Sequence, residues 1–334
     1  MRTRLLRCLQ FGWLLLPSVG LTGAETPSLA EVLGLVREHL VGVSAAEVDQ
    51  AALKGLLDQL SPRVQFVDEE PVNPSAAAEA ERLGAVGRPG QRFGYLQLKA
   101  LENGAATAIH DRLTGWAEGT PVEGLILDLR FAGGSDFAEV VRVASEFLAE
   151  PVPLLDWGEG VREAVPVDAG FRGPLLVLIN AGTTGAAEAL AAVLQRTERA
   201  LTIGASTAGL AVVYGAYPLS SGGRLRIATG LVKLGDGSSF PATGVPADLK
   251  IEVPAGIEKA NMAAFARTLA ETAVADAGKA TEPGRSGGEG ESADGPPRAK
   301  PPGPSSAMTP SDPCLARGLD LLTGLAVVRH REAP

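Results

Sequence analysis

The sequence predicts an α/β fold with largely parallel strands. Residues 124–129 and 174–179 are short, nearly continuous apolar runs, which are typical of strands covered on both faces. After each run, a turn containing glycine leads into a helical pattern, at about 137–148 and 185–195. A repeated order of strand, glycine turn and helix indicates a parallel sheet with helical crossovers.

Three further segments extend this core. Residues 94–98 alternate like a half-buried strand, and a helical pattern follows from about 105 to 116. Residues 201–234 contain shorter alternating stretches around Ser221-Gly222-Gly223, which predict a hairpin.

Two helices are expected before the core. Ser28 with Glu31, and Ser44 with Glu47, each form a capping box ahead of a helical apolar pattern. Ser61-Pro62 then ends the second helix.

The first 24 residues have the pattern of a signal peptide. Arg2, Arg4 and Arg7 precede an apolar run at 11–21, and small residues stand before a cut expected at Glu25. We therefore expect an exported protein of the bacterial periplasm or a secreted one. An uncleaved anchor is the alternative, and the signal segment is then the only membrane contact.

The predicted organisation has six parts. They are a signal peptide (1–24), a helical segment (25–70), a linker (71–92), the α/β core (93–277), a disordered tether rich in Gly, Pro and Ser (278–311) and a final helix (312–334). Asp312 and Pro313 form the start of that helix. It either docks on the core, which we favour, or binds a partner.

Composition excludes several functions. The net charge is −9 without a long basic run, which argues against a nucleic-acid partner. The three histidines, His39, His110 and His330, lie far apart and have no zinc-binding spacing, and only Cys314 remains after the signal. We therefore expect no metal, no other cofactor and no disulfide.

Without further information, few residues suggest chemistry. Gly133-Gly134 either presents N–H groups to an anion or is only a permissive turn, which is the more common reading. Asp128 and Arg130, at a strand end, form either a structural ion pair or a site, and we favour the ion pair.

Five elements in order resemble the tail-specific (carboxyl-terminal processing) serine proteases. The similar segments are 124–134 with its Asp-Leu-Arg and Gly-Gly, 175–188, 199–204, 207–210 and 244–248. The resemblance covers most of the mature chain and implies a ClpP/crotonase-like spiral core. The family's peptide-docking PDZ module is not expected here, because only the linker at 71–92 stands in its place.

The family's chemistry is peptide hydrolysis by a serine that a lysine activates and a glutamine orients. By position, the resemblance assigns the nucleophile to Gly185, the base to Leu210 and the orienting residue to Tyr214. Glycine offers no nucleophile and leucine accepts no proton, so all three functions are expected to be lost. A remnant oxyanion pocket of Gly133, Gly134 and Ala186 is expected to bind without cleaving.

Substitute residues are scarce. Thr184 is a weak substitute nucleophile, and the other hydroxyls nearby are those of Thr183, Ser206 and Thr207. No lysine occurs between Lys99 and Lys233, and Arg196 and Arg199 stay protonated, so the base would have to be His110 or a carboxylate such as Glu188.

The sequence therefore predicts a non-catalytic relative that binds a peptide or an exported partner protein. The alternatives are an active serine-type or threonine-type peptidase with relocated residues, and a structural envelope protein.

Overall fold

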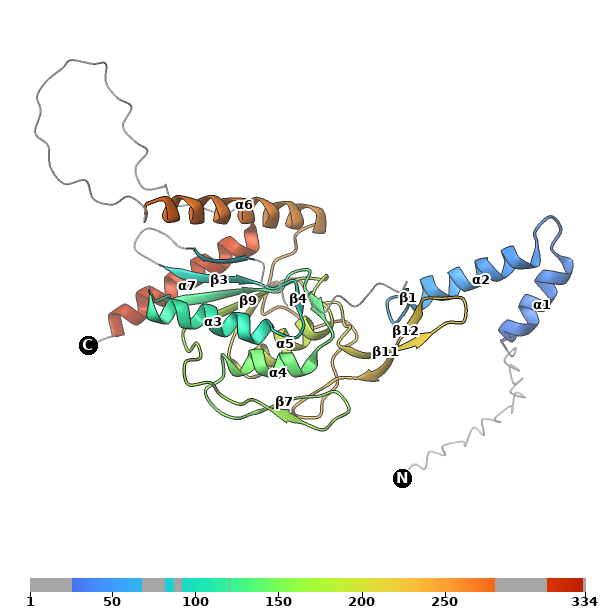
Figure 1. The fold of residues 1–334 in the computed structure, drawn as a ribbon, viewed down its shortest axis with the longest axis horizontal. Coiled ribbons are helices and arrows are strands. Elements are labelled where there is room, and N and C mark those ends of the chain that lie inside the picture. The colour runs from blue at the N-terminus through green and yellow to red at the C-terminus, as the bar shows by residue number, and fades with distance from the viewer. Residues whose placement is uncertain (1–25, 68–81, 87–91, 120, 280–310, 333–334) are drawn as a thin grey trace, which may run out of the picture. The chain divides into compact units, whose positions relative to one another are not determined.

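A computed structural model of the chain describes residues 26–67, 82–86, 92–119, 121–279 and 311–332 (Figure 1). The chain divides into two compact units, with the boundary between Ser61 and Pro62. The predicted signal peptide, most of the linker and most of the tether lie outside the described residues. Within the described ranges, no helix combines the length and the apolar character needed to cross a membrane.

A six-stranded sheet forms the centre of the second unit. Its order is β14 (Leu249–Lys250), β10 (Leu201–Gly204), β9 (Leu175–Ile179), β5 (Gly124–Asp128), β3 (Phe93–Gln97) and β2 (Arg82–Val86). The five strands from β14 to β3 run parallel, which confirms the prediction, and β2 is antiparallel to β3. Residues 82–86 were expected within the linker. They instead form β2, because they pair with β3 of the core.

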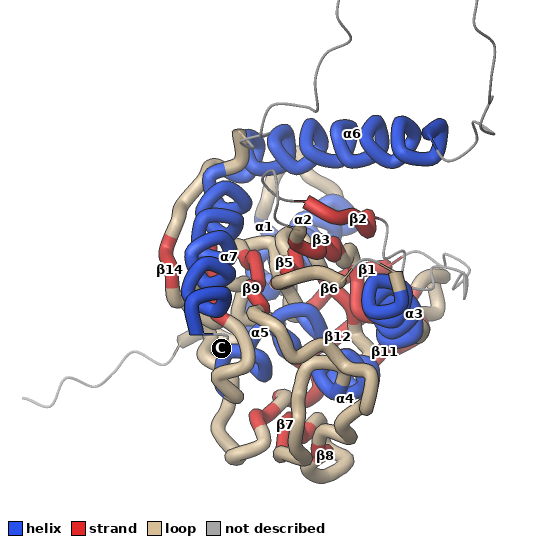
Figure 2. The backbone as a smooth tube through the Cα atoms, turned by 90° about the vertical axis from the view of Figure 1, so that its left-hand side faces the viewer, coloured by secondary structure: helices blue, strands red, loops and turns tan. Residues whose placement is uncertain are grey.

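Helices cover both faces of this sheet (Figures 1 and 2). Leu125 and Leu127 of β5 pack with α3 (Ala105–Glu118), α4 (Phe137–Ser145) and α5 (Gly185–Arg196). Ile126, between them, packs on the opposite face with α6 (Ala255–Lys279) and α7 (Pro313–Glu332). Alternate side chains of one strand therefore serve two apolar cores, which explains the continuous apolar run in the sequence.

The last helix, α7, docks on the core, as we favoured. Leu315, Leu319 and Leu322 are buried against the sheet. Asp312 caps the helix, because its Oδ1 accepts the backbone N–H groups of Cys314 and Leu315 at 3.0 and 3.2 Å. Burial raises the pKa of the Cys314 thiol to about 12.

A buried ion cluster ties this helix to the strand end. Arg130 is 2% exposed and pairs with Asp128 at 2.6 Å, Asp312 at 2.7 Å and Glu258 at 3.4 Å. The Tyr95 hydroxyl donates to Asp128 at 2.8 Å. Asp128 and Arg130 thus form a structural ion pair, since both side chains are almost completely buried.

Three smaller sheets complete this unit. They are β1 (Val64–Val67) with β12 (Arg224–Leu231) and β11 (Val212–Pro218); β13 (Lys233–Leu234) with β7 (Pro153–Asp156) and β8 (Arg162–Glu163); and β4 (Ala100–Leu101) with β6 (Gly133–Gly134). Strands β11 and β12 pair antiparallel around residues 219–223, so the hairpin prediction is confirmed.

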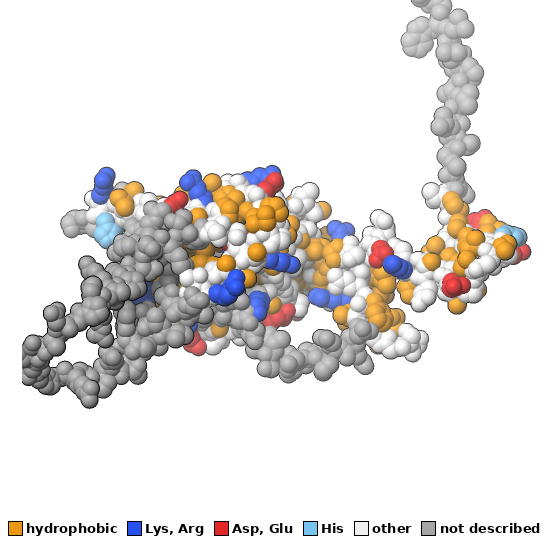
Figure 3. All heavy atoms as spheres, turned by 90° about the horizontal axis from the view of Figure 1, so that it is seen from above, with side chains coloured by type: hydrophobic (Ala, Val, Ile, Leu, Met, Phe, Trp, Pro, Cys, Tyr) orange, Lys and Arg blue, Asp and Glu red, His pale blue; other side chains and the backbone are white. Residues whose placement is uncertain are grey.

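The first unit contains two helices, α1 (Leu29–His39) and α2 (Ala45–Leu60). Ser44 and Glu47 form the predicted capping box, and Ser28 accepts the N–H of Glu31. Val48 is the one buried residue of the two helices, and large apolar side chains such as Leu35 and Leu53 are exposed. Figure 3 shows apolar side chains on the surface of the described part of the chain.

Candidate functional site

One cavity brings the predicted site residues together. It has a volume of about 280 Å³, and we call it the Gly185 cavity. Its lining residues are Pro62, Gln65, Glu102, Gly134, Ser135, Thr184, Gly185, Leu210, Tyr214 and Arg226. The structure thus joins the three positions assigned by resemblance with the substitute candidate Thr184, although they come from separate segments.

The main chain closes on Gly185. This residue begins α5 with a φ of +57°, a left-handed conformation that favours glycine. A Cβ at this position would lie closer than 3.0 Å to the carbonyl oxygen of Gly134, a separation that real Cβ atoms essentially never show. A side chain at 185 therefore requires the Gly134 peptide to move.

Of the three residues expected in the oxyanion pocket, Gly134 lines the Gly185 cavity, and Gly133 and Ala186 do not. The N–H of Gly133 donates to the carbonyl of Lys99 at 2.9 Å, because Gly133-Gly134 forms β6 and pairs with β4. This N–H cannot also bind an oxyanion. Gly134 turns its carbonyl toward Gly185, and a carbonyl is an acceptor that repels an anion. Ala186 follows in the first turn of α5 and is fully buried.

Glu188 holds the loop that carries Leu210. Its carboxylate accepts the Thr207 hydroxyl at 2.6 Å and the N–H groups of Gly209 and Leu210 at 2.8 and 2.7 Å. Burial raises the pKa of Glu188 above its ordinary value, and these hydrogen bonds act in the opposite direction. Since both oxygens are engaged, Glu188 positions the loop and is not free to act as a base.

The nearby hydroxyls differ in their availability. Thr183 donates to the Leu129 carbonyl at 2.8 Å, and Thr207 bonds Glu188 and the N–H of Val245. Thr184 is the N-cap of α5, and its side chain makes no capping bond there. It lines the Gly185 cavity, whereas Thr183, Ser206 and Thr207 do not.

His110 is placed away from this cavity. It lies on α3 and its Nδ1 is 3.1 Å from Glu146, which follows α4. Neither residue lines the Gly185 cavity. His39 on α1 and His330 on α7 lie on other helices. The predicted substitute bases, His110 and Glu188, are therefore both committed elsewhere.

Sequence reasoning missed two charged residues that line the cavity, Glu102 and Arg226. Glu102 accepts the Ser135 N–H at 2.9 Å, and Arg226 lies 4.1 Å from the centre of the Tyr214 ring. The Tyr214 hydroxyl donates to the Pro62 carbonyl at 3.2 Å. Only strand register brings Arg226 to this cavity, and the sequence contains no local signal for it.

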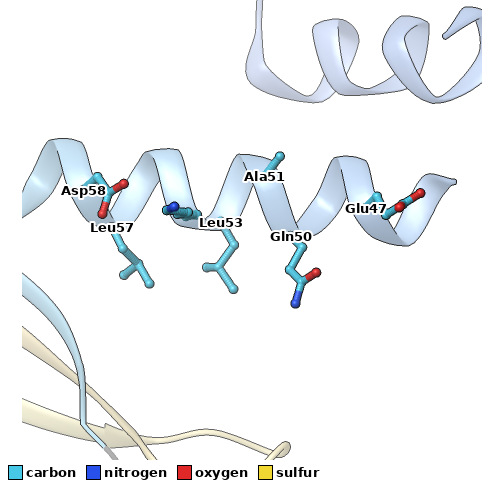
Figure 4. A pocket seen from close by; sticks show the side chains of 7 residues that line it. Glu47, Gln50, Ala51, Leu53, Leu57 and Asp58 are labelled. Atoms are coloured by element: carbon cyan, nitrogen blue, oxygen red, sulfur yellow. The ribbon is translucent and has the colours of Figure 1, made fainter. Parts of the chain in front are cut away.

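A second hollow runs along α2 (Figure 4). All of its lining residues come from that one helix: Glu47, Gln50, Ala51, Leu53, Lys54, Leu57 and Asp58. Because no second element supplies a wall, the hollow is one face of a helix and not an enclosed site.

Comparison with known protein families agrees with the fold of the core. Residues 92–251 match the family model of Peptidase family S41. This stretch is a little under half of the chain, and it is similar to the peptidases of family S41. The resemblance to the tail-specific proteases is thereby confirmed, and the matched region contains the central parallel strands and most of the Gly185 cavity.

Curated relatives match the same region. The chain is 30% identical over 161 residues to "Carboxyl-terminal-processing peptidase 2, chloroplastic" of Arabidopsis thaliana. This match covers 47% of this chain and 31% of that protein. It is 30% identical over 138 residues to "Carboxy-terminal-processing protease" of Bartonella bacilliformis, which covers 40% of this chain and 32% of that protein. The chain thus spans about a third of the length of these relatives.

A solved structure described as "photosystem II D1 C-terminal processing protease" also resembles the chain. Its TM-score is 0.42 at 26% identity, over 57% of this chain and 48% of that one.

Proposed function

We propose that this chain is a non-catalytic S41 protein that binds an extended peptide, or a segment of a partner protein, in the Gly185 cavity. The main support is the joint replacement at Gly185, Leu210 and Tyr214, three residues that line one cavity. Loss of the nucleophile alone typically costs about a millionfold in turnover. A cavity of about 280 Å³ lies beside these three residues, which favours binding over a purely structural role.

The backbone around Gly185 supports the same proposal. The Gly134 carbonyl stands where a nucleophilic side chain would begin, and the predicted oxyanion donor Gly133 is already bonded to Lys99. Hydrolysis requires a nucleophile, a base and a place for negative charge. At the positions that the family resemblance assigns, Gly185 offers no nucleophile, Leu210 offers no base, and the Gly133 N–H already donates to the Lys99 carbonyl.

Peptide cleavage and peptide binding are to be measured together on the purified protein. The substrates are unfolded β-casein and short peptides with free C-termini. The matched variant is Thr184→Val, which replaces the hydroxyl with a methyl group of similar size. We expect no turnover from either protein, and binding by the wild type in calorimetry. Turnover by the wild type that disappears in Thr184→Val overturns the proposal. Absence of both turnover and binding overturns the peptide-binding part.

A threonine-type peptidase is the second candidate function. The observation in its favour is the Thr184 hydroxyl, which faces the cavity without a capping bond. A fluorophosphonate adduct mapped to Thr184 would establish this candidate. We expect no adduct, because the two carboxylates considered as a base already accept hydrogen bonds. Glu102 accepts one from Ser135, and Glu188 accepts them from the 207–210 loop.

A purely structural envelope role that works through the final helix is the third reading. Since Leu315, Leu319 and Leu322 fill one core of the sheet, deleting 278–334 would expose that core and damage the fold. A point change at the exposed face of α7 is therefore the better test, and Val328→Asp is suitable because Val328 is 51% exposed. We expect it to leave peptide binding intact.

We also propose export through residues 1–24. N-terminal sequencing of the protein recovered from a periplasmic fraction is expected to begin at Glu25. Recovery with Met1 in the membrane fraction would instead indicate the uncleaved anchor.

A further inference from the structure

Arg226 is a half-buried cation without a carboxylate partner among the described residues. It lies on β12 and lines the Gly185 cavity. The half-buried Arg199 offers a contrast, because it donates to the carbonyls of Phe147, Phe171 and Gly173. Arg226 instead lies over the face of Tyr214, with its guanidinium carbon 4.1 Å from the centre of the ring.

Strand register explains how this pair forms. In the sheet β1-β12-β11, Arg226 pairs directly with Gln65 and lies diagonal to Tyr214, whose own partner is Ala228. Direct and diagonal partners project from the same face of a sheet, within reach of long side chains. Gln65, Tyr214 and Arg226 therefore form one polar wall of the cavity.

The stacking leaves the donors of Arg226 available. A ring face contacts the plane of a guanidinium and holds it by cation–π attraction, so the N–H groups at its edge remain free. A guanidinium edge presents paired donors that match the two oxygens of a carboxylate. Tyr214, at the position that the resemblance assigns to the orienting residue, thus orients an arginine here.

Charge and size restrict the ligand. Glu102 is on another wall, where Ser135 donates to it, and no ion pair joins it to Arg226 in the described structure. A ligand carboxylate is repelled by Glu102 and attracted to Arg226. The volume of about 280 Å³ is near the lower end of ligand sites, about 300 Å³, so only a short piece of chain enters.

We infer that Arg226, held over Tyr214, is the carboxylate-recognition residue of the Gly185 cavity, and that the ligand inserts a free C-terminus or an acidic side chain. This inference rests on the proposed peptide binding and specifies its chemistry.

The first experiment compares Arg226→Gln with the wild type, using the full chain and unfolded β-casein as the probe. The matched control is Arg224→Gln, which removes an exposed arginine of the same strand and face that does not line the cavity. We expect Arg226→Gln to weaken binding about tenfold or more and Arg224→Gln to leave it unchanged. Arg226→Lys, which keeps the charge and loses the paired donors, is expected to be intermediate.

Short probes identify the source of the carboxylate. N-acetyl-trialanine with a free C-terminus is compared with its amide, and N-acetyl-Ala-Asp-Ala-amide with its Asn counterpart, by NMR titration. Weaker binding of the amide indicates terminal recognition, and weaker binding of the Asn peptide indicates side-chain recognition. Both results support the inference.

Three outcomes are distinguishable. If casein binds and Arg226→Gln binds equally well, the inference is overturned and the proposed function stands. If Arg224→Gln weakens binding as much as Arg226→Gln, general surface charge is responsible and the inference is again overturned. If neither casein nor any short probe binds the wild type, the proposed function fails and the inference fails with it.

Discussion

The carbonyl oxygen of Gly134 lies against the Cα of Gly185, at the place where a side chain on residue 185 would begin. These two residues belong to different strand–turn–helix units, β6 and the start of α5. Their approach depends on glycine at both positions, because Gly134 itself has a φ of +119° and no room for a Cβ beside Leu101. Residue 185 therefore has no room for a side chain unless the Gly134 peptide moves.

Gly185→Ala is expected to destabilise the fold by about 3 kcal/mol. Alanine pays about 1–2 kcal/mol for the left-handed φ, and the collision with Gly134 adds about 1–3 kcal/mol. The control is Gly237→Ala, which has a φ of +81° but nothing within 4 Å, so it incurs only the first cost. Urea unfolding measures both variants, and equal losses would contradict the collision.

Glu188→Gln is expected to loosen the 207–210 loop and to cost about 1–3 kcal/mol. A glutamine keeps one oxygen, but its NH₂ group faces N–H donors that need an acceptor. Hydrogen exchange at the Gly209 and Leu210 amides checks this, and both are expected to exchange faster than in the wild type. Protection equal to the wild type would show that the carboxylate does not hold the loop.

The stability of the fold is expected to fall as the pH rises above about 4.5, through the contribution of Glu258. Burial raises the pKa of Glu258, so the folded state keeps this proton to a higher pH than the unfolded state. The contribution is most favourable below the unfolded pKa and is lost as the pH passes through the raised folded pKa. Glu258→Gln is expected to flatten the decline in urea unfolding between pH 4.5 and 7.

Glu252 is a suitable control, because its contribution to stability depends on pH in the opposite direction. The pKa of the exposed Glu252 is lowered by the Lys250 ammonium, so its contribution is lost as the pH falls. Glu252→Gln is therefore expected to leave the decline above pH 4.5 in place. If Glu258→Gln retains the full decline, another group is responsible.

Asp312→Ala is expected to expose the thiol of Cys314. Asp312 caps α7 and pairs with Arg130, and breaking one partner of such a buried pair costs about 3–5 kcal/mol. In the wild type, the raised pKa and burial of Cys314 keep the thiol protonated and slow to react. Labelling by a thiol reagent, in a Cys8→Ala background, is expected to be at least tenfold faster in the variant.

Ser311→Ala is the matched control, because Ser311 is exposed and precedes the cap. Labelling of this control is expected at the wild-type rate. Slow labelling of Asp312→Ala would mean that apolar packing alone holds α7 in place.

The sequence alone was sufficient for much of the fold. Apolar runs that serve two cores predicted β5 and β9, and local capping patterns such as Ser44 with Glu47 predicted where helices begin. These signals are local, because a strand's burial pattern and a helix cap involve residues a few positions apart. The family motif also singled out Gly185, Leu210 and Tyr214, which do line one cavity.

Only the tertiary structure decided what surrounds those three residues. The pairing of β4 with β6 occupies the Gly133 N–H, and the register of β1 and β12 brings Gln65 and Arg226 to the cavity. Strand pairing joins residues far apart in the chain, and one register shift would turn each side chain to the other face. No local pattern records that choice, so Arg226 and the Gly134 carbonyl became visible only in the folded chain.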